Sequence, residues 1–165
     1  MTLRSHKSTL AIAAALLVVP GANATKRPHD RTLEISGDLV QPLFPGASQP
    51  LDLALTNRAG VTLSITRLRV RMSVDRAHRR TGCSASRDFV VGRLPRSAFP
   101  ITLPGRRNGR TGRPLRTTRT LSALGLRTLP SVGMRDLPST NQDACKGAKL
   151  RLRFSGRARE LRRRP

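Results

Sequence analysis

VTLSITRLRVRMSV, at residues 61–74, carries the strongest structural signal in the chain. Apolar and polar residues alternate along it, which is typical of a β-strand with one buried face. The apolar residues hold odd positions as far as Ile65 and even positions from Leu68 onward. An uninterrupted strand cannot change the face that it buries, so the shift near Thr66 predicts a β-bulge or a bend.

The same period of two recurs on both sides of this stretch, and turn signals such as Pro45-Gly46 and Asn108-Gly109 separate the repeats. Further candidate strands are residues 33–39, 49–57, 89–91, 99–103, 114–121 and 149–154. Only residues 122–126 favour a helical turn. About seven short, half-buried strands predict an all-β fold, an antiparallel β-sandwich.

The N-terminus has the pattern of a cleaved signal peptide. Arg4 and Lys7 precede an apolar run at residues 10–19, and Ala22-Asn23-Ala24 is a small-x-small cleavage pattern. A membrane anchor is the alternative, but this run is well short of the roughly 20 residues that cross a bilayer. No cysteine follows the cleavage point, which argues against a lipoprotein. We expect residues 1–24 to be removed and the product to be extracellular or held at the cell envelope.

The remaining chain is long enough for one domain. We expect a disordered N-terminal segment at residues 25–30, a single domain at residues 31–156, and a basic C-terminal tail at residues 157–165. Residues 105–120 contain six arginines and three glycines, and they predict an exposed, mobile loop. No second apolar span follows the signal, so we expect no transmembrane segment after processing.

The chain is strongly basic, with 32 Lys and Arg against nine Asp and Glu and a formal net charge of +23. Loss of Arg4 and Lys7 with the signal leaves +21. Such a balance indicates a nucleic acid, an anionic membrane or another polyanion as partner. Only four of the basic residues are lysines, and a GC-rich genome also favours arginine codons. The charge alone therefore leaves a functional and a compositional explanation open.

The two cysteines, Cys83 and Cys145, are most simply one disulfide in an oxidising compartment. The bridge would close a loop of about 60 residues and contribute on the order of 4 kcal/mol in the chain-entropy model. Metal binding is a weaker hypothesis, because there is no CxxC motif and His6 and His29 lie in or near the predicted signal. We expect no metal and no cofactor.

Basic residues alternate with apolar ones on two of the candidate strands. Arg67, Arg69 and Arg71 share one face of the strand at residues 61–74. The last strand repeats the pattern with Lys149, Arg151 and Arg153. These six residues are the candidate polyanion-binding set, and the alternative is a solvated outer face. Sequence-specific nucleic-acid recognition is not expected, since stacking aromatics and a helix-turn-helix pattern are lacking.

The best enzymatic arrangement is His78, Cys145 and Arg153, whose order resembles sortases, exported β-barrel transpeptidases. There a thiolate attacks a peptide carbonyl and an arginine stabilises the oxyanion. The resemblance is poor, because the sortase TLxTC sequence is replaced by NQDAC at residues 141–145 and Cys83 is available to pair with Cys145. No histidine follows His78, which excludes a papain-like order. We expect no catalytic residues and no enzymatic activity.

Several longer motifs point to one family. These are LEISGDLVQPLFPGASQPLDLALTN at residues 33–57, VTLSITRLRVRM at 61–72, TLSALG at 120–125 and NQDACKGAKLRLRFSGRA at 141–158. Together they resemble small exported Ig-like domains found in uncharacterised secreted proteins of high-GC bacteria. The resemblance implies an Ig-like β-sandwich with a loop-to-strand disulfide and no activity. The long Gly/Arg stretch before TLSALG departs from the family pattern, and the core Trp of antibody domains is absent.

Together these features predict an exported, non-catalytic Ig-like domain with a structural or adhesive role at the cell envelope. The second hypothesis is non-specific binding of a polyanion, either an envelope glycopolymer or DNA. A sortase-like cysteine transpeptidase is a remote third.

Overall fold

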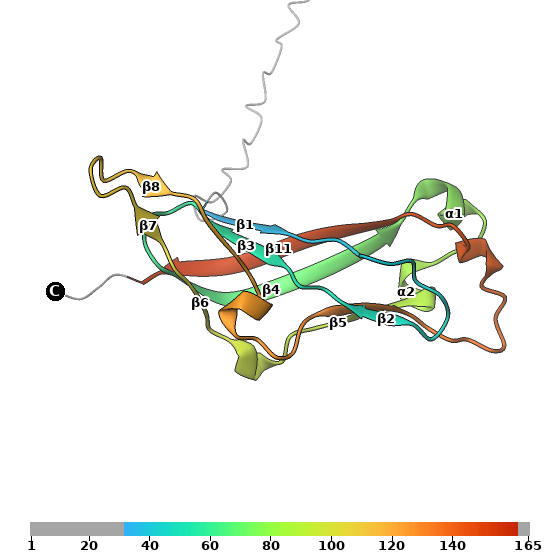
Figure 1. The fold of residues 1–165 in the computed structure, drawn as a ribbon. Helices are drawn as coiled ribbons and strands as arrows, with labels where there is room; N and C mark the ends of the chain where they lie inside the picture. The colour runs from blue at the N-terminus through green and yellow to red at the C-terminus, as the bar shows by residue number, and fades with distance from the viewer. Residues whose placement is uncertain (1–31, 162–165) are drawn as a thin grey trace, which may run out of the picture.

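The computed structural model describes residues 32–161 (Figure 1). The predicted signal peptide, the segment at residues 25–30 and the last four residues of the chain lie outside this range. The described part is mostly β-strand, in antiparallel sheets with one cysteine pair at disulfide distance, as predicted. None of its helices is long and apolar enough to cross a membrane.

Within residues 32–161, eleven strands form three three-stranded sheets and one hairpin, and within each sheet the paired strands are antiparallel. The first sheet has the order β1 (Leu33–Ser36), β3 (Ala54–Asn57), β9 (Thr117–Thr120). The second has the order β2 (Ser48–Pro50), β10 (Ser131–Met134), β5 (Phe89–Gly92). The third has the order β11 (Leu150–Glu160), β4 (Leu63–Val74), β6 (Ile101–Leu103), and β7 (Arg106–Arg107) pairs with β8 (Pro114–Leu115).

The helices are short and connect the strands. They are α1 (Arg76–Arg80), α2 (Ala85–Asp88) and the 3-10 turns η2 (Arg96–Ala98), η3 (Ser122–Leu124) and η4 (Asp143–Cys145). The Asp75 and Ser84 side chains accept backbone N–H hydrogen bonds at the starts of α1 and α2. The predicted helical turn at residues 122–126 is confirmed by η3. The expectation that it is the only one is wrong, because α1, α2, η2 and η4 are helical as well.

β4 contains the predicted irregularity. Its pairing with β11 shifts register, so that Arg157 lies opposite Arg67 and Ala158 opposite Ile65. Thr66 is therefore the extra residue of a β-bulge. Because of this bulge, Leu63 and Ile65 before it and Leu68, Val70 and Met72 after it all pack against the core, although their positions differ in parity. The prediction of a bulge near Thr66 is confirmed.

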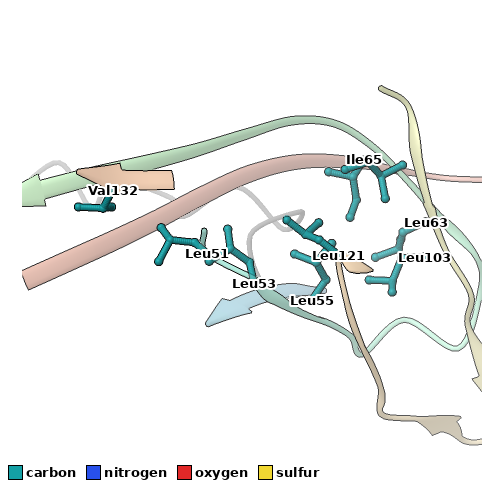
Figure 2. Close-up of a cluster of buried hydrophobic side chains, with 9 residues drawn as sticks. Leu51, Leu53, Leu55, Leu63, Ile65, Leu103, Leu121 and Val132 are labelled. Carbon is teal, nitrogen blue, oxygen red and sulfur yellow. The ribbon is translucent and has the colours of Figure 1, made fainter. Parts of the chain in front are cut away.

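The main core lies between the sheets (Figure 2). Its buried members are Leu51, Leu53, Leu55, Leu63, Ile65, Ile101, Leu103, Leu121 and Val132. The first three come from the predicted strand at residues 49–57, which is in fact divided between β2 in one sheet and β3 in another. Pro50 ends β2 because it has no N–H to give to a neighbouring strand, and the N–H of Leu51 donates instead to the carbonyl of Pro130 at 2.7 Å.

Three further sequence predictions need correction. The domain does not end at residue 156, because β11 continues to Glu160 and the Leu161 N–H donates to the Thr62 carbonyl at 2.8 Å. Residues 157–160 are therefore strand and not tail. The alternation was hard to recognise there because the inward-facing residues, Gly156 and Ala158, are small. Gly156 leaves room for β1, since a Cβ at this position would lie only 2.9 Å from Ile35 Cδ1.

The stretch at residues 105–120 is also not a loop throughout, because it forms the β7–β8 hairpin, with a turn organised by Asn108, and then β9. β8 and β9 lie within the strand predicted at residues 114–121, so that prediction is confirmed and only the hairpin was missed. The Asn108 side-chain oxygen accepts from the N–H groups of Arg110 and Thr111, and the Arg107 guanidinium donates to the Gly112 carbonyl at 3.0 Å. Polar side chains thus supply order that hydrophobic periodicity cannot reveal.

The third correction is β10, which the sequence prediction missed although it is the central strand of its sheet. It is four residues long, with Gly133 interrupting the apolar signal of Val132 and Met134. A side chain at position 133 would be crowded, because a Cβ on Gly133 would lie 3.1 Å from the Ala47 carbonyl oxygen. Short strands with an internal glycine carry too little pattern to be recognised.

Candidate functional site: an arginine ladder on β4 and β11

β4 and β11 are neighbours, and they bring most of the candidate residues onto one surface (Figure 1). Arg71 lies directly opposite Arg153, while Arg69 lies opposite Ser155 and Arg151 opposite Ser73. All of these arginines are exposed, and they alternate with half-buried apolar residues that point to the core. The two strands thus form a ribbon with one apolar and one cationic face.

The structure adds two arginines that the sequence prediction left in the tail. Arg157 lies opposite Arg67, and Arg159 lies opposite Ser64 beyond the bulge. The outward side chains follow a period of two that continues past residue 156, and this period was the available signal. We call the full set the arginine ladder, which consists of Arg67, Arg69, Arg71, Arg151, Arg153, Arg157 and Arg159.

The ladder has a regular spacing. Side chains on one face of a strand recur every ~7 Å, and neighbouring strands lie about 5 Å apart. Along the ribbon, rungs with one arginine alternate with rungs with two, and the doubled rungs are Arg71 with Arg153 and Arg67 with Arg157. Like charges placed opposite each other across strands are destabilising.

The ladder arginines have no carboxylate partners in the part of the chain that the structure describes. The ion pairs there join Glu34 to Arg58 and Arg116, Asp75 to His78, and Asp88 to Arg87. Seven guanidinium groups therefore face solvent on one surface, and no carboxylate of residues 32–161 lies within ion-pair distance of them. The arrangement can bind several anionic groups at once.

Lys149, the last of the predicted candidates, lies one residue before β11 and is exposed. Its backbone N–H donates to the Asp75 carboxylate at 2.8 Å, and its carbonyl accepts from the Asp75 N–H at 3.0 Å. The same carboxylate accepts from His78 Nδ1 at 2.7 Å and from the N–H groups of Ala77 and His78. Asp75 thereby joins the start of α1 to the start of β11.

Burial raises the pKa of Asp75, but the hydrogen bonds from the Lys149 and His78 N–H groups and from the His78 ring outweigh it and lower that pKa to about 2. The carboxylate is therefore ionised at neutral pH. The hydrogen bonds of the α1–β11 junction hold this charge in place.

Cys83 and Cys145 form the predicted disulfide, with their Cα atoms 4.9 Å apart. The bridge belongs to a second, smaller core with Val74, Phe89 and Met134. It connects the chain after α1 to η4, and so it holds together the end of the molecule beyond the ladder.

A buried carboxylate lies against this disulfide. Asp88 is fully buried, and it accepts from the Ser84 N–H at 2.7 Å and from Arg87 Nε at 2.8 Å. The Arg87 hydrogen bonds keep the pKa of Asp88 below its usual value although burial raises it. Cys83, Asp88 and Cys145 are the one grouping with metal-ligand geometry among residues 32–161. Metals bind thiolates, and both sulfurs are used in the disulfide.

The remote catalytic arrangement is not assembled. His78 is hydrogen-bonded to Asp75, Cys145 is bonded to Cys83, and Arg153 lies on the ladder opposite Arg71. A disulfide sulfur is not a nucleophile, so this state offers no thiolate at Cys145.

No family model, curated protein or solved structure matches this chain. Its function therefore has to be inferred from charge and geometry.

Proposed function

We propose that this chain is an exported Ig-like β-sandwich domain that binds an anionic polymer through the arginine ladder. One observation carries the proposal: seven exposed arginines on two paired strands have no carboxylate partner among the described residues. Polyanion binding is the second hypothesis from the sequence, after a structural or adhesive role, and the unpartnered ladder supports it over a purely structural role.

Five described arginines outside the ladder have partners that explain their positions, whereas others, such as Arg76 and Arg79, have no ion pair among the described residues. The opposed rungs are therefore what sets the ladder apart. Arg58 and Arg116 pair with Glu34, and Arg87 pairs with Asp88. Arg107 and Arg135 donate to backbone carbonyls. An arginine excess from codon supply alone would not gather unpartnered arginines into opposed rungs. A solvent-exposed face of lysines and glutamates would be the less costly way to keep the sheet soluble.

The ladder favours phosphate or sulfate groups as its ligands. A guanidinium donates two parallel hydrogen bonds to such groups, which a lysine cannot do. A polymer that places an anion at each rung also removes the repulsion within the doubled rungs and releases its own counterions. The outward residues between the arginines are small and polar, so recognition of bases by stacking is not expected. The binding should therefore be insensitive to sequence.

The Ig-like class and export rest on the sequence. The motifs at residues 33–57 and 141–158 support the first, and the N-terminal charge and apolar run support the second. Antiparallel sheets and a disulfide are consistent with both.

The proposal is tested by measuring binding of the processed protein to duplex DNA, to a poly(glycerol phosphate) polymer and to uncharged dextran. We expect binding to both phosphate polymers and none to dextran. The variant Arg67→Gln/Arg69→Gln should bind at least ten-fold more weakly. Arg106→Gln/Arg110→Gln on the β7–β8 hairpin removes the same charge away from the ladder and should bind as the wild type does. Equal losses of affinity in the two variants would mean that binding depends only on net charge, and would refute the ladder as the binding site.

A further inference from the structure

A groove of about 820 Å³ lies where the β4–β11 ribbon meets α1 and the segment that follows β1. Its lining has three parts. Met72, Leu150 and Leu152 are apolar and half-buried. Arg76 and Arg79 come from α1, and the ribbon adds Arg71, Lys149, Arg151 and Arg153. Gly37 and Asp38 also line the groove.

The apolar part lies at the junction of the two cores. Met72 packs against both of them, Leu152 against the main core and Leu150 against the disulfide core. The two cores do not merge here, and the apolar face of the ribbon is left partly open. This explains why a groove exists at this position. Its size is within the range of ligand sites, which is roughly 300–1,000 Å³.

The charged part is strongly unbalanced. Six cationic and two acidic residues line the groove. Asp75 is held by the α1–β11 hydrogen bonds, and Asp38 accepts from the neighbouring Leu39 N–H at 2.8 Å. None of the six cations has an ion-pair partner among residues 32–161. A ligand that complements this groove carries negative charge at one part and hydrocarbon at another.

We propose that the groove binds a single-chain anionic amphiphile, with a phosphate or a similar anionic head group. Arg76, Arg79 and Lys149 contact the head group, and the hydrocarbon chain packs on Met72, Leu150 and Leu152. Arginine suits this head group because it can donate two parallel hydrogen bonds to one phosphate. The site goes beyond polymer binding by the ladder. Arg71, Arg151 and Arg153 of the ladder also line it, but their side chains project from the opposite face of the ribbon to Met72, Leu150 and Leu152. The apolar part and the α1 arginines belong to the groove alone.

The test is calorimetric titration of the processed protein with inorganic phosphate and with hexyl, octyl and decyl phosphate, each below its micelle concentration. Burial of one methylene is worth about 0.8 kcal/mol, which is about four-fold in affinity. We expect the affinity to rise by up to about four-fold for each added carbon. Inorganic phosphate alone should bind weakly. Decanol, which lacks the charge, should bind far less tightly than decyl phosphate. An affinity that does not depend on chain length would overturn the proposal.

Variants assign the binding to the groove. Arg76→Gln/Arg79→Gln should weaken decyl phosphate binding at least ten-fold. The matched control is Arg106→Gln/Arg110→Gln on the β7–β8 hairpin, at the opposite end of the molecule from α1 (Figure 1), and it should bind as the wild type does. Equal effects of the two would refute a specific site. Arg67→Gln/Arg69→Gln should leave decyl phosphate binding unchanged, because neither residue lines the groove, so failure of polymer binding and failure of the groove are separate results.

Discussion

Replacement of Cys83 and Cys145 by serine removes a crosslink between residues 62 positions apart. In the chain-entropy model, a loop of this length stabilises the folded state by about 4 kcal/mol. Unfolding entropy is about 2.1 cal/mol/K per residue near 60 °C. For the 130 residues at positions 32–161 this gives about 0.27 kcal/mol/K. We therefore expect the double variant to melt about 15 °C below the wild type.

The measurement is a thermal melt followed by circular dichroism, for the double variant and for the wild type with and without reductant. Both changes remove the same bridge, so the variant and the reduced wild type should melt at similar temperatures. Replacing both cysteines avoids a lone thiol beside the buried Asp88 carboxylate, which would add a second effect. A shift below about 3 °C would show that the bridged end does not unfold with the rest of the domain, and would refute the reasoning.

Three further predictions address other parts of the molecule. The Asp75 pKa is about 2 in the folded state and 3.8 ordinarily, so the contribution of Asp75 to the free energy of unfolding is present above about pH 4 and is lost as the pH falls toward 2. Urea unfolding of the wild type should show this loss of stability, and an equal loss in Asp75→Asn would contradict the prediction. Gly156→Val should cost about 1–3 kcal/mol, because a Cβ there meets Ile35 and Leu33 of β1, whereas outward-facing Ser155→Val should cost far less in the same denaturant titration. N-terminal sequencing of secreted protein should begin at Thr25, and a form that keeps Met1 in the membrane fraction would exclude cleavage.

The regular parts of the fold were predictable from the sequence because they repeat a simple period. The alternation in residues 61–74 gave β4, its buried face and the bulge at Thr66, which the register confirms. The arginines on β4 and the last strand were identified as one candidate surface for the same reason. The cysteine pairing followed from an even count in a chain that is predicted to be exported, and the bridge is present.

The parts that were missed depend on contacts between distant residues. The predicted strand at residues 49–57 is divided because its two parts pair with different partners, β2 with β10 and β3 with β1 and β9. The end of the domain was placed too early because Gly156 and Ala158 face inward without an apolar signature. The groove arises from the position of α1 and from two cores that do not merge, neither of which has a local sequence signal.

The most direct test of the ladder is the salt dependence of duplex DNA binding, measured as the slope of log affinity against log salt concentration. Each phosphate contact contributes about −0.9 to this slope, so seven ladder arginines predict a slope of about −6. Arg67→Gln/Arg69→Gln should flatten it by about 2. Deletion of residues 162–165 is the control for the basic C-terminus, and it leaves β11 complete because that strand ends at Glu160. An unchanged slope in the ladder variant, together with loss of binding on the deletion, would contradict the account.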